Sequence, residues 1–450
     1  MYKPIFMLAL TAFVFSFMVL VSELDYIRRP TASIVLFLGV FFSLRPKKYV
    51  HPCMLVLVNY LLYFVMPYSL YLIYDMFDID YILPWGMLYD WGKVSATAVS
   101  HFELTFLFFY LGMFFSSEIL LRKAVSNTGA KREYDVRLSG VMILMVTMAI
   151  GIAAFLNRTG GLSAWISNYS STYITAKEGI GFINYLLINT AHLLAFIAGW
   201  IIWRTRKKVS YLIWLPLIAI LILCIFLQGI KSRIPLILFF FLMPKISTMK
   251  VNIRKAVIIF FSLILFFMVA MYFRSDGFYS TPRMAIEYLQ SYFNMIFLHD
   301  MVLTNYFPGE WVSMFMGMNK YTEIFVGKLP RETYDLSVAL TQIYYPDTWF
   351  KFGATQQWPI ESDFYLTFPS PLFWALPICL YSLMISVLYK FATNGVPVIM
   401  FIYSAEFVRI MSIFRSSLLT WNVLIIAIFY VVVLVGCTAL IFRKERIVAT

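Results

Sequence analysis

Apolar segments of helical length follow one another along most of the chain. We predict membrane helices at residues 5–22, 30–44, 52–74, 94–121, 138–157, 181–203, 210–227, 233–243, 256–273, 370–390, 396–414 and 417–441. A bilayer requires roughly 20 apolar residues per helix, so these make about 12 spans, of which the second and the eighth are short. The first run lacks a small-residue cleavage site, and we therefore expect it to remain as an uncleaved span.

One stretch, residues 274–369, interrupts this series. The chain therefore divides into helices 1 to 9 (residues 1–273), a large outer loop (274–369) and helices 10 to 12 (370–450). Loops of this length are uncommon in compact domains unless they carry function or structure of their own.

The outer loop has helical character. Thr281-Pro282 followed by apolar residues at helical spacing predicts a helix with a capped start, and a second helical stretch is expected from Trp311 to Val326. Tyr345-Pro346-Asp347 indicates a turn. We therefore predict an all-α polytopic membrane protein with one large, partly helical periplasmic loop.

Charged residues set the orientation of the predicted helices. With both termini in the cytoplasm, the basic loops all face inward: Arg45–Lys48, Arg122–Arg137, Arg204–Lys208, Lys245–Lys255 and Arg443–Arg446. A composition of 61% hydrophobic and 13% charged residues excludes a soluble protein, and these loops carry much of the net charge of +13. The positive charge therefore reflects the orientation of the helices in the membrane, and we expect no nucleic-acid partner.

Several cations depart from this pattern because they lie at the outer ends of predicted helices: Lys231, Arg233, Arg274, Arg283, Arg409 and Arg415. A single cation at this depth commonly anchors a helix end. Several together predict a site for a phosphate-bearing lipid, because guanidinium groups bind phosphate oxygens bidentately. Glu406 stands one turn from Arg409, and this pair has either a structural or a functional role.

Three residues of the outer loop are candidate proton acceptors. Glu361 and Asp363 immediately precede helix 10, and His299 follows the first predicted loop helix. Each could accept a proton from a hydroxyl near the arginines, and a purely structural role is the alternative. We interpret His101 and Glu103 of the fourth helix as interior groups. The sequence contains no HExxH or EF-hand spacing, and we interpret Asp78-Ile79-Asp80, which has DxD spacing, as a solvated part of an outer loop, so we expect neither a metal nor a cofactor.

Aromatic residues of the loop are candidates for stacking on sugars: Trp311, Tyr344, Tyr345, Trp349 and Trp358. The ordinary alternative for each is membership of an interfacial aromatic belt.

Four short motifs stand at these positions: Lys231-Ser232-Arg233-Ile234-Pro235-Leu236, Arg274-Ser275-Asp276-Gly277, Glu361-Ser362-Asp363-Phe364-Tyr365-Leu366-Thr367-Phe368 and Phe414-Arg415-Ser416-Ser417. With the many spans and the one late outer loop, they resemble the oligosaccharide repeat-unit polymerases, the Wzy-type O-antigen polymerases of bacterial envelopes. Pro369 stands where members of that family often carry a glycine.

The resemblance implies a metal-independent glycosyltransferase of the bacterial inner membrane, similar to the GT-C class. Such an enzyme moves a glycan from undecaprenyl diphosphate onto another lipid-linked repeat unit in lipopolysaccharide biosynthesis. It implies diphosphate contacts from Arg233, Arg274 and Arg409, with Arg283 and Arg415 as further candidates. His299 corresponds to the loop histidine of the related ligases. Candidate partners are the lipid-linked oligosaccharide, membrane lipid, a flippase and a chain-length regulator.

Two other functions share this chemistry. A flippase or other transporter for lipid-linked oligosaccharides would also need cations, but along a path through the bilayer. An O-antigen ligase would differ only in its acceptor. The phenotype of cells lacking the protein separates polymerase from flippase: a single repeat unit on the surface lipid in the first case, and inner-leaflet accumulation in the second.

Overall fold

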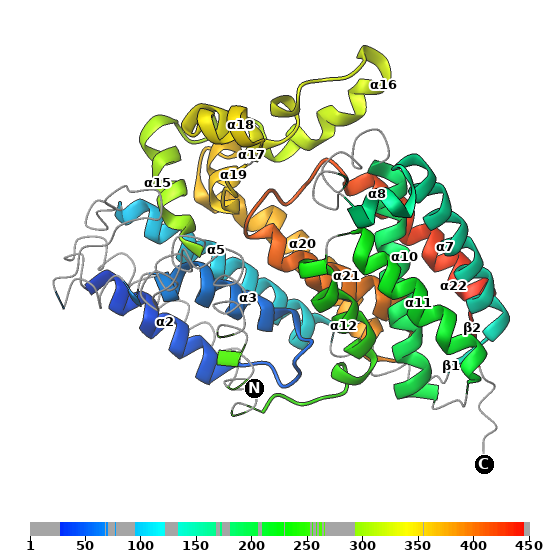
Figure 1. Ribbon diagram of the computed structural model, residues 1–450. Coiled ribbons are helices and arrows are strands. Elements are labelled where there is room, and N and C mark those ends of the chain that lie inside the picture. Colours follow the sequence, from blue (N-terminus) through cyan, green and yellow to red (C-terminus); the bar gives the residue numbers. More distant parts are fainter. Residues whose placement is uncertain are drawn as a thin grey trace.

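The computed structural model describes residues 28–67, 69–70, 95–121, 134–167, 181–205, 209–228, 230–252, 293–353 and 355–444, with isolated positions 77, 172, 254, 258, 261, 262 and 265. Almost all of this part of the chain with regular structure is helical (Figure 1). The all-α prediction is confirmed at this level.

The helices up to the outer loop are α2 (Arg28–Leu44), α3 (Pro52–Tyr60), α5 (Ala96–Phe115), α7 (Leu138–Arg158), α8 (Gly161–Ser167), α10 (Gly181–Trp200), α11 (Tyr211–Leu227) and α12 (Ile230–Ile246). Three of them continue as π turns, after α3 at Leu61–Val65, after α5 at Ser116–Leu120 and after α10 at Ile201–Thr205.

The outer loop contains α15 (Met295–Asn305), α16 (Glu323–Val326), α17 (Leu336–Tyr344), α18 (Pro346–Phe352) and α19 (Ile360–Thr367), with 3₁₀ turns at Ser313–Thr322 and Arg331–Thr333. A third 3₁₀ turn, Pro371–Trp374, leads into α20 (Ala375–Thr393), which α21 (Pro397–Ile413) and α22 (Val423–Leu440) follow. The stretch expected at Trp311 to Val326 is thus helical mainly in the tighter 3₁₀ form. The turn predicted at Tyr345-Pro346-Asp347 is instead the junction of two helices, with Pro346 in the first position of α18.

Five helices are long and apolar enough to cross a membrane: Ala96–Leu120, Leu138–Arg158, Ile183–Thr205, Pro371–Thr393 and Val423–Leu440. Pro52–Val65 and Tyr211–Leu227 are apolar but shorter. The predicted runs 5–22 and 256–273 lie outside the described residues or nearly so. The total of about 12 spans therefore stays a prediction.

The outward faces of the apolar helices support a membrane environment. On α22, Ile428 is 64% and Val432 62% exposed, and α7 likewise leaves Val146 and Ile150 uncovered. Rows of uncovered aliphatic side chains this extensive are uncommon on soluble proteins, whereas lipid tails are an apolar solvent for them.

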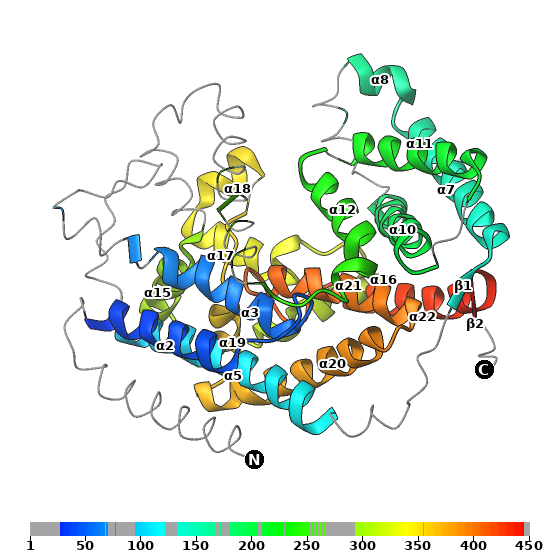
Figure 2. The same ribbon diagram turned by 90° about the horizontal axis from the view of Figure 1, so that it is seen from below.

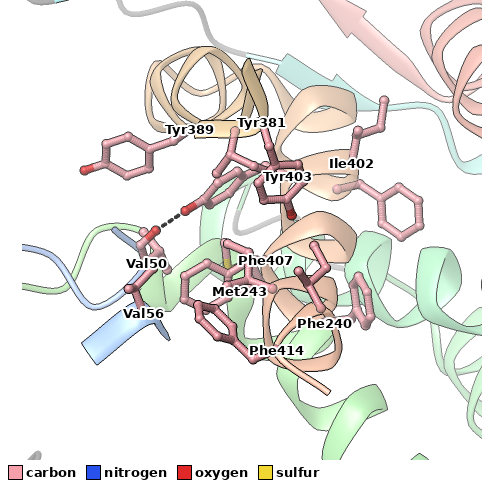
Figure 3. Close-up of a cluster of buried hydrophobic side chains, with 14 of the residues drawn as sticks. Val50, Val56, Phe240, Met243, Tyr381, Tyr389, Ile402, Tyr403, Phe407 and Phe414 are labelled. Atoms are coloured by element: carbon pink, nitrogen blue, oxygen red, sulfur yellow. Dashed lines mark hydrogen bonds between the residues drawn. The ribbon is translucent and has the colours of Figure 1, made fainter. Parts of the chain in front are cut away.

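Helix α21 lies at the centre of the bundle and packs against α3, α10, α12, α20 and α22 (Figure 2). Tyr403 and Phe407 project from it among buried side chains of neighbouring helices, and the Tyr403 hydroxyl donates to the carbonyl of Val50 (Figure 3). This bond satisfies a buried phenol and ties the central helix to the loop before α3.

A glycine permits the close contact between α10 and α12. A Cβ at Gly199 of α10 would lie 1.9 Å from the backbone oxygen of Phe241 in α12, so only glycine fits there. The two helices pack backbone to backbone at this point.

The two ends of the bundle are different. At one end, β1 (Tyr134–Val136) pairs antiparallel with β2 (Phe442–Lys444), and Lys48 forms an isolated bridge with Lys250. These segments belong to loops that the charge pattern assigned to the inner side. The helices of the outer loop lie at the opposite end (Figure 1).

Candidate active site

The candidate site is organised by α19, a short helix of the outer loop that lies buried against the outer half of α5. Its residues Glu361, Ser362 and Asp363 are at most 2% exposed. Successive residues of an α-helix point about 100° apart, so three in a row face three directions. On α19 each direction meets a different element: α5, α15, and the 3₁₀ turn at Ser313–Thr322.

Ser362 faces a buried pair of histidines. His299 of α15 places Nδ1 3.1 Å from the Ser362 hydroxyl and Nε2 2.9 Å from Nδ1 of His101 in α5. Burial, reinforced by the charge of His101, lowers the pKa of His299 well below its usual value. The histidine is therefore neutral at pH 7 and joins the outer loop to the fourth predicted span.

This placement changes the interpretation of His299 made from sequence and adds a partner to that of His101. His299 lies within α15 and is fully buried, with both ring nitrogens engaged by residues of the protein. A hydroxyl of a substrate cannot reach it in this conformation. His101 is an interior residue, as expected, but its partner is a residue of the loop.

A second contact holds α15 against α5. Asp300 accepts hydrogen bonds from the hydroxyl of Ser95 at 2.6 Å and from its backbone N–H at 3.1 Å. Ser95 in turn caps α5 by accepting from the N–H of Ala98 at 3.1 Å. The start of this apolar helix is thus fixed by a residue of the outer loop.

Glu361 faces α5. Burial raises its pKa to about 8, and its own backbone amide and the neighbouring Thr105 hydroxyl only partly offset this effect by favouring the charged form. Its Oε2 atom has no hydrogen-bond partner among the described residues. At pH 7 this carboxyl is largely protonated.

Asp363 faces the opposite side. Its Oδ1 atom accepts a hydrogen bond of 2.6 Å from Ser313, while Oδ2 has no hydrogen-bond partner in the described part of the chain. Burial raises the pKa of Asp363 to about 6, against the influence of Ser313, Ser417 and the Leu418 amide, which favour the charged form. At pH 7 this carboxyl is therefore largely ionised, unlike that of Glu361.

The segment 414–420 connects Asp363 with Arg409. Leu418 presents its amide to Asp363, and its carbonyl accepts a hydrogen bond of 3.0 Å from Nη2 of Arg409 in α21. Arg409 also forms an ion pair of 3.5 Å with Glu406, which accepts from the Tyr430 hydroxyl at 2.9 Å. The predicted pair of Glu406 and Arg409 is confirmed, and Arg409 has a scaffold partner on each side.

The other predicted cations are only partly described. The guanidinium of Arg415 lies 5.7 Å above the ring of Tyr63. Arg233 interacts electrostatically with His192, and Arg409 with Tyr185. His192 and Tyr185 are about two turns apart on one face of α10. Arg274, Arg283 and the side chain of Lys231 lie outside the described residues. Their convergence with Arg409 stays a prediction.

The predicted sugar-stacking residues lie on the loop but differ in exposure. Trp358 is 1% exposed and packs against Tyr344 and Tyr345, so it forms part of the loop interior. Trp349 packs beneath Arg331. Trp311, by contrast, packs edge-on against Tyr306 and is only partly covered. Trp311 and Trp349 are thus better placed for a ligand than Trp358.

Among the described residues, no group of three or more His, Cys, Asp or Glu side chains could hold a metal ion. Comparison of the chain with protein-family models, with curated proteins and with solved structures finds no match.

Proposed function

We propose that the protein is a polymerase of the bacterial inner membrane that joins oligosaccharide repeat units carried on undecaprenyl diphosphate. The observation that carries the proposal is the connection of an ionised acid with an arginine. Asp363 and Arg409 both contact the backbone of Leu418, in the short segment 414–420.

The reaction needs two groups of this kind. The acceptor hydroxyl attacks the anomeric carbon of the donor glycan while the bond from that carbon to the diphosphate breaks. Undecaprenyl diphosphate departs with the electron pair, and the proton of the acceptor passes to a base. Arginine stabilises the departing diphosphate because its planar fork binds two phosphate oxygens and stays charged.

The two acids of α19 are suited to different roles. A base works best when its pKa lies near the operating pH, which favours Asp363 with a pKa of about 6. Glu361, with a pKa of about 8, is largely neutral at pH 7 and is assigned a positioning role beside Thr105. His299 has no part in proton transfer in this assignment, because both its nitrogens bind within the protein.

The proposal requires the segment 414–420 to move. Asp363 is fully buried beneath it, and the Oδ2 atom that would accept the proton faces no hydrogen-bond donor in suitable geometry among the described residues. Displacement of Leu418 by the substrate would uncover Asp363 and release the bond that holds Arg409.

The test is polymer length on a lipopolysaccharide gel from cells that carry single variants. We expect Asp363→Asn to reduce chain extension about 10²- to 10⁴-fold and Arg409→Ala by about 10²- to 10³-fold, leaving a single repeat unit on the surface lipid. Lys351→Ala, which removes an exposed loop cation paired with Asp347, is the control and should extend chains normally.

Wild-type polymer from the Asp363→Asn protein would refute the assignment of the base. Repeat units trapped on the inner leaflet would identify a flippase, and loss of transfer of preformed polymer to the lipid A core would identify a ligase.

A further inference from the structure

Three cations meet at the end of the bundle opposite the candidate active site. Lys48 lies in the loop between α2 and α3, Arg204 in the π turn after α10, and Lys390 in the last turn of α20. They are separated by more than 150 residues from one to the next. Backbone and side-chain contacts between the loops that carry them fix their relative positions.

The backbone brings Lys48 between the other two. Its bridge with Lys250 joins it to the turn after α12, where Ser247 accepts a hydrogen bond of 3.0 Å from Nη2 of Arg204. On the other side, the carbonyl of Lys48 accepts from the N–H of His51, whose ring lies 4.9 Å from that of Tyr389, next to Lys390.

The positive charges at this position are only partly balanced by the described residues. Glu118, the acid that faces the cluster, lies 3.8 Å from Lys390 and 3.5 Å from His51. Lys48 forms no ion pair within the described ranges, and Arg204 is bonded to a carbonyl and a hydroxyl, both uncharged. Burial, together with the charges of Lys390 and Arg204, lowers the pKa of Lys48 below its usual value. Three like charges held together in this way favour a bound anion.

The side chains are also partly ordered in advance. Arg204 donates through Nε to the carbonyl of Pro244 and lies over the ring of Trp200, and its Nη1 atom has no hydrogen bond in the part of the chain that the structure describes. Lys390 lies 5.8 Å from the ring centroid of Tyr389 and is 18% exposed. A planar guanidinium beside two ammonium groups suits the oxygens of a phosphate.

We propose that Lys48, Arg204 and Lys390 form a binding site for a phosphate group, supplied by the headgroup of an anionic phospholipid. The site lies at the ends of apolar helices, where lipid headgroups are present at high local concentration, and basic sites between helices are suited to such headgroups. The ligand would bridge α2–α3, α10 and α20, and so stabilise the contact between the two sides of the bundle. Free phosphate has the same chemistry, and the experiment separates the two sources.

The experiment measures the melting temperature and native mass spectrum of the full chain in detergent at constant ionic strength. The added ligands are dioleoyl phosphatidylglycerol, dioleoyl phosphatidylcholine and inorganic phosphate, each in a separate titration. We expect the wild-type protein to retain phosphatidylglycerol and to melt at a higher temperature with it than with phosphatidylcholine. Lys48→Gln and Lys390→Gln should each weaken phosphatidylglycerol binding about fivefold.

Lys351→Gln removes an equal charge from an exposed lysine of α18 and is the control, which should bind as the wild type does. Melting without lipid shows whether each variant is folded. A response to inorganic phosphate equal to that for phosphatidylglycerol would support the anion site and assign it to free phosphate. Equal binding of both lipids, or binding unchanged in the two lysine variants, would overturn the proposal.

Discussion

Replacing Glu361 by glutamine tests the interpretation of α19 most directly. The pKa of this carboxyl is raised from 4.5 to about 8 by burial, so the folded protein holds a proton that the unfolded chain has released. Because the folded-state pKa is the higher one, stability is lost as the pH rises from 4.5 to 8 and changes no further above that. Each pH unit within this range costs about 1.4 kcal/mol of unfolding free energy.

The two proteins are best compared between pH 6 and 8, because Asp363, with a pKa of about 6, is mostly ionised over this range. Over these two units the wild-type protein should lose about 2 to 3 kcal/mol relative to Glu361→Gln, whose amide does not titrate. Other titrating groups are shared by both proteins and cancel in the comparison. The amide matches the neutral acid in shape, so we also expect chain extension to persist at pH 7.

The assay is denaturant-induced unfolding of both proteins in one detergent at half-unit pH steps. Parallel stability curves from pH 6 to 8 would show that the Glu361 carboxyl ionises normally and is not desolvated in solution. A variant that is folded and shows the flattened curve, but has lost chain extension, would place Glu361 among the catalytic groups and refute its positioning role.

Two further predictions concern the packing. Gly199→Ala should prevent normal packing of α10 on α12, because its Cβ would lie 1.9 Å from the Phe241 oxygen. Gly436→Ala on α22 is the control, since a Cβ there meets nothing within 4 Å. Size-exclusion chromatography compares the yields of folded protein, and equal yields of the two variants would contradict the described packing. Asp300→Ala removes both bonds to Ser95 and should cost about 1 to 2 kcal/mol, seen as a lower melting temperature and faster proteolysis of the outer loop. Unchanged proteolysis would show that this contact does not hold the loop.

Hydropathy was sufficient to predict where most of the helices lie. Helix α7 occupies Leu138–Arg158 against an expected 138–157, and α22 occupies Val423–Leu440 within an expected 417–441. Apolar length is a local property, and a helix in lipid must satisfy its own backbone, so sequence determines it directly. The third run, expected to reach residue 74, is interrupted by a π turn at Leu61–Val65 that composition does not indicate.

The site was predictable only in part. The acids of α19 can be recognised from the sequence because Glu361 and Asp363 stand together immediately before the predicted tenth helix. Their surroundings could not be derived, since the His101–His299 contact joins residues 198 positions apart. Hydropathy assigns each histidine to its segment, but it carries no information on which segments are neighbours. The contact between Ser362 and His299 cannot be derived from the sequence for the same reason.

The three directions in which Glu361, Ser362 and Asp363 point from α19 determine which sequence changes this helix can accept. A substitution at Glu361, Ser362 or Asp363 removes one contact and leaves the other two in place. An insertion or deletion of a single residue before Glu361 would instead rotate all three by about 100°, so that each side chain faced its neighbour's partner. Length variation should therefore accumulate elsewhere in the outer loop, while the spacing from Trp358 to Thr367 stays constant.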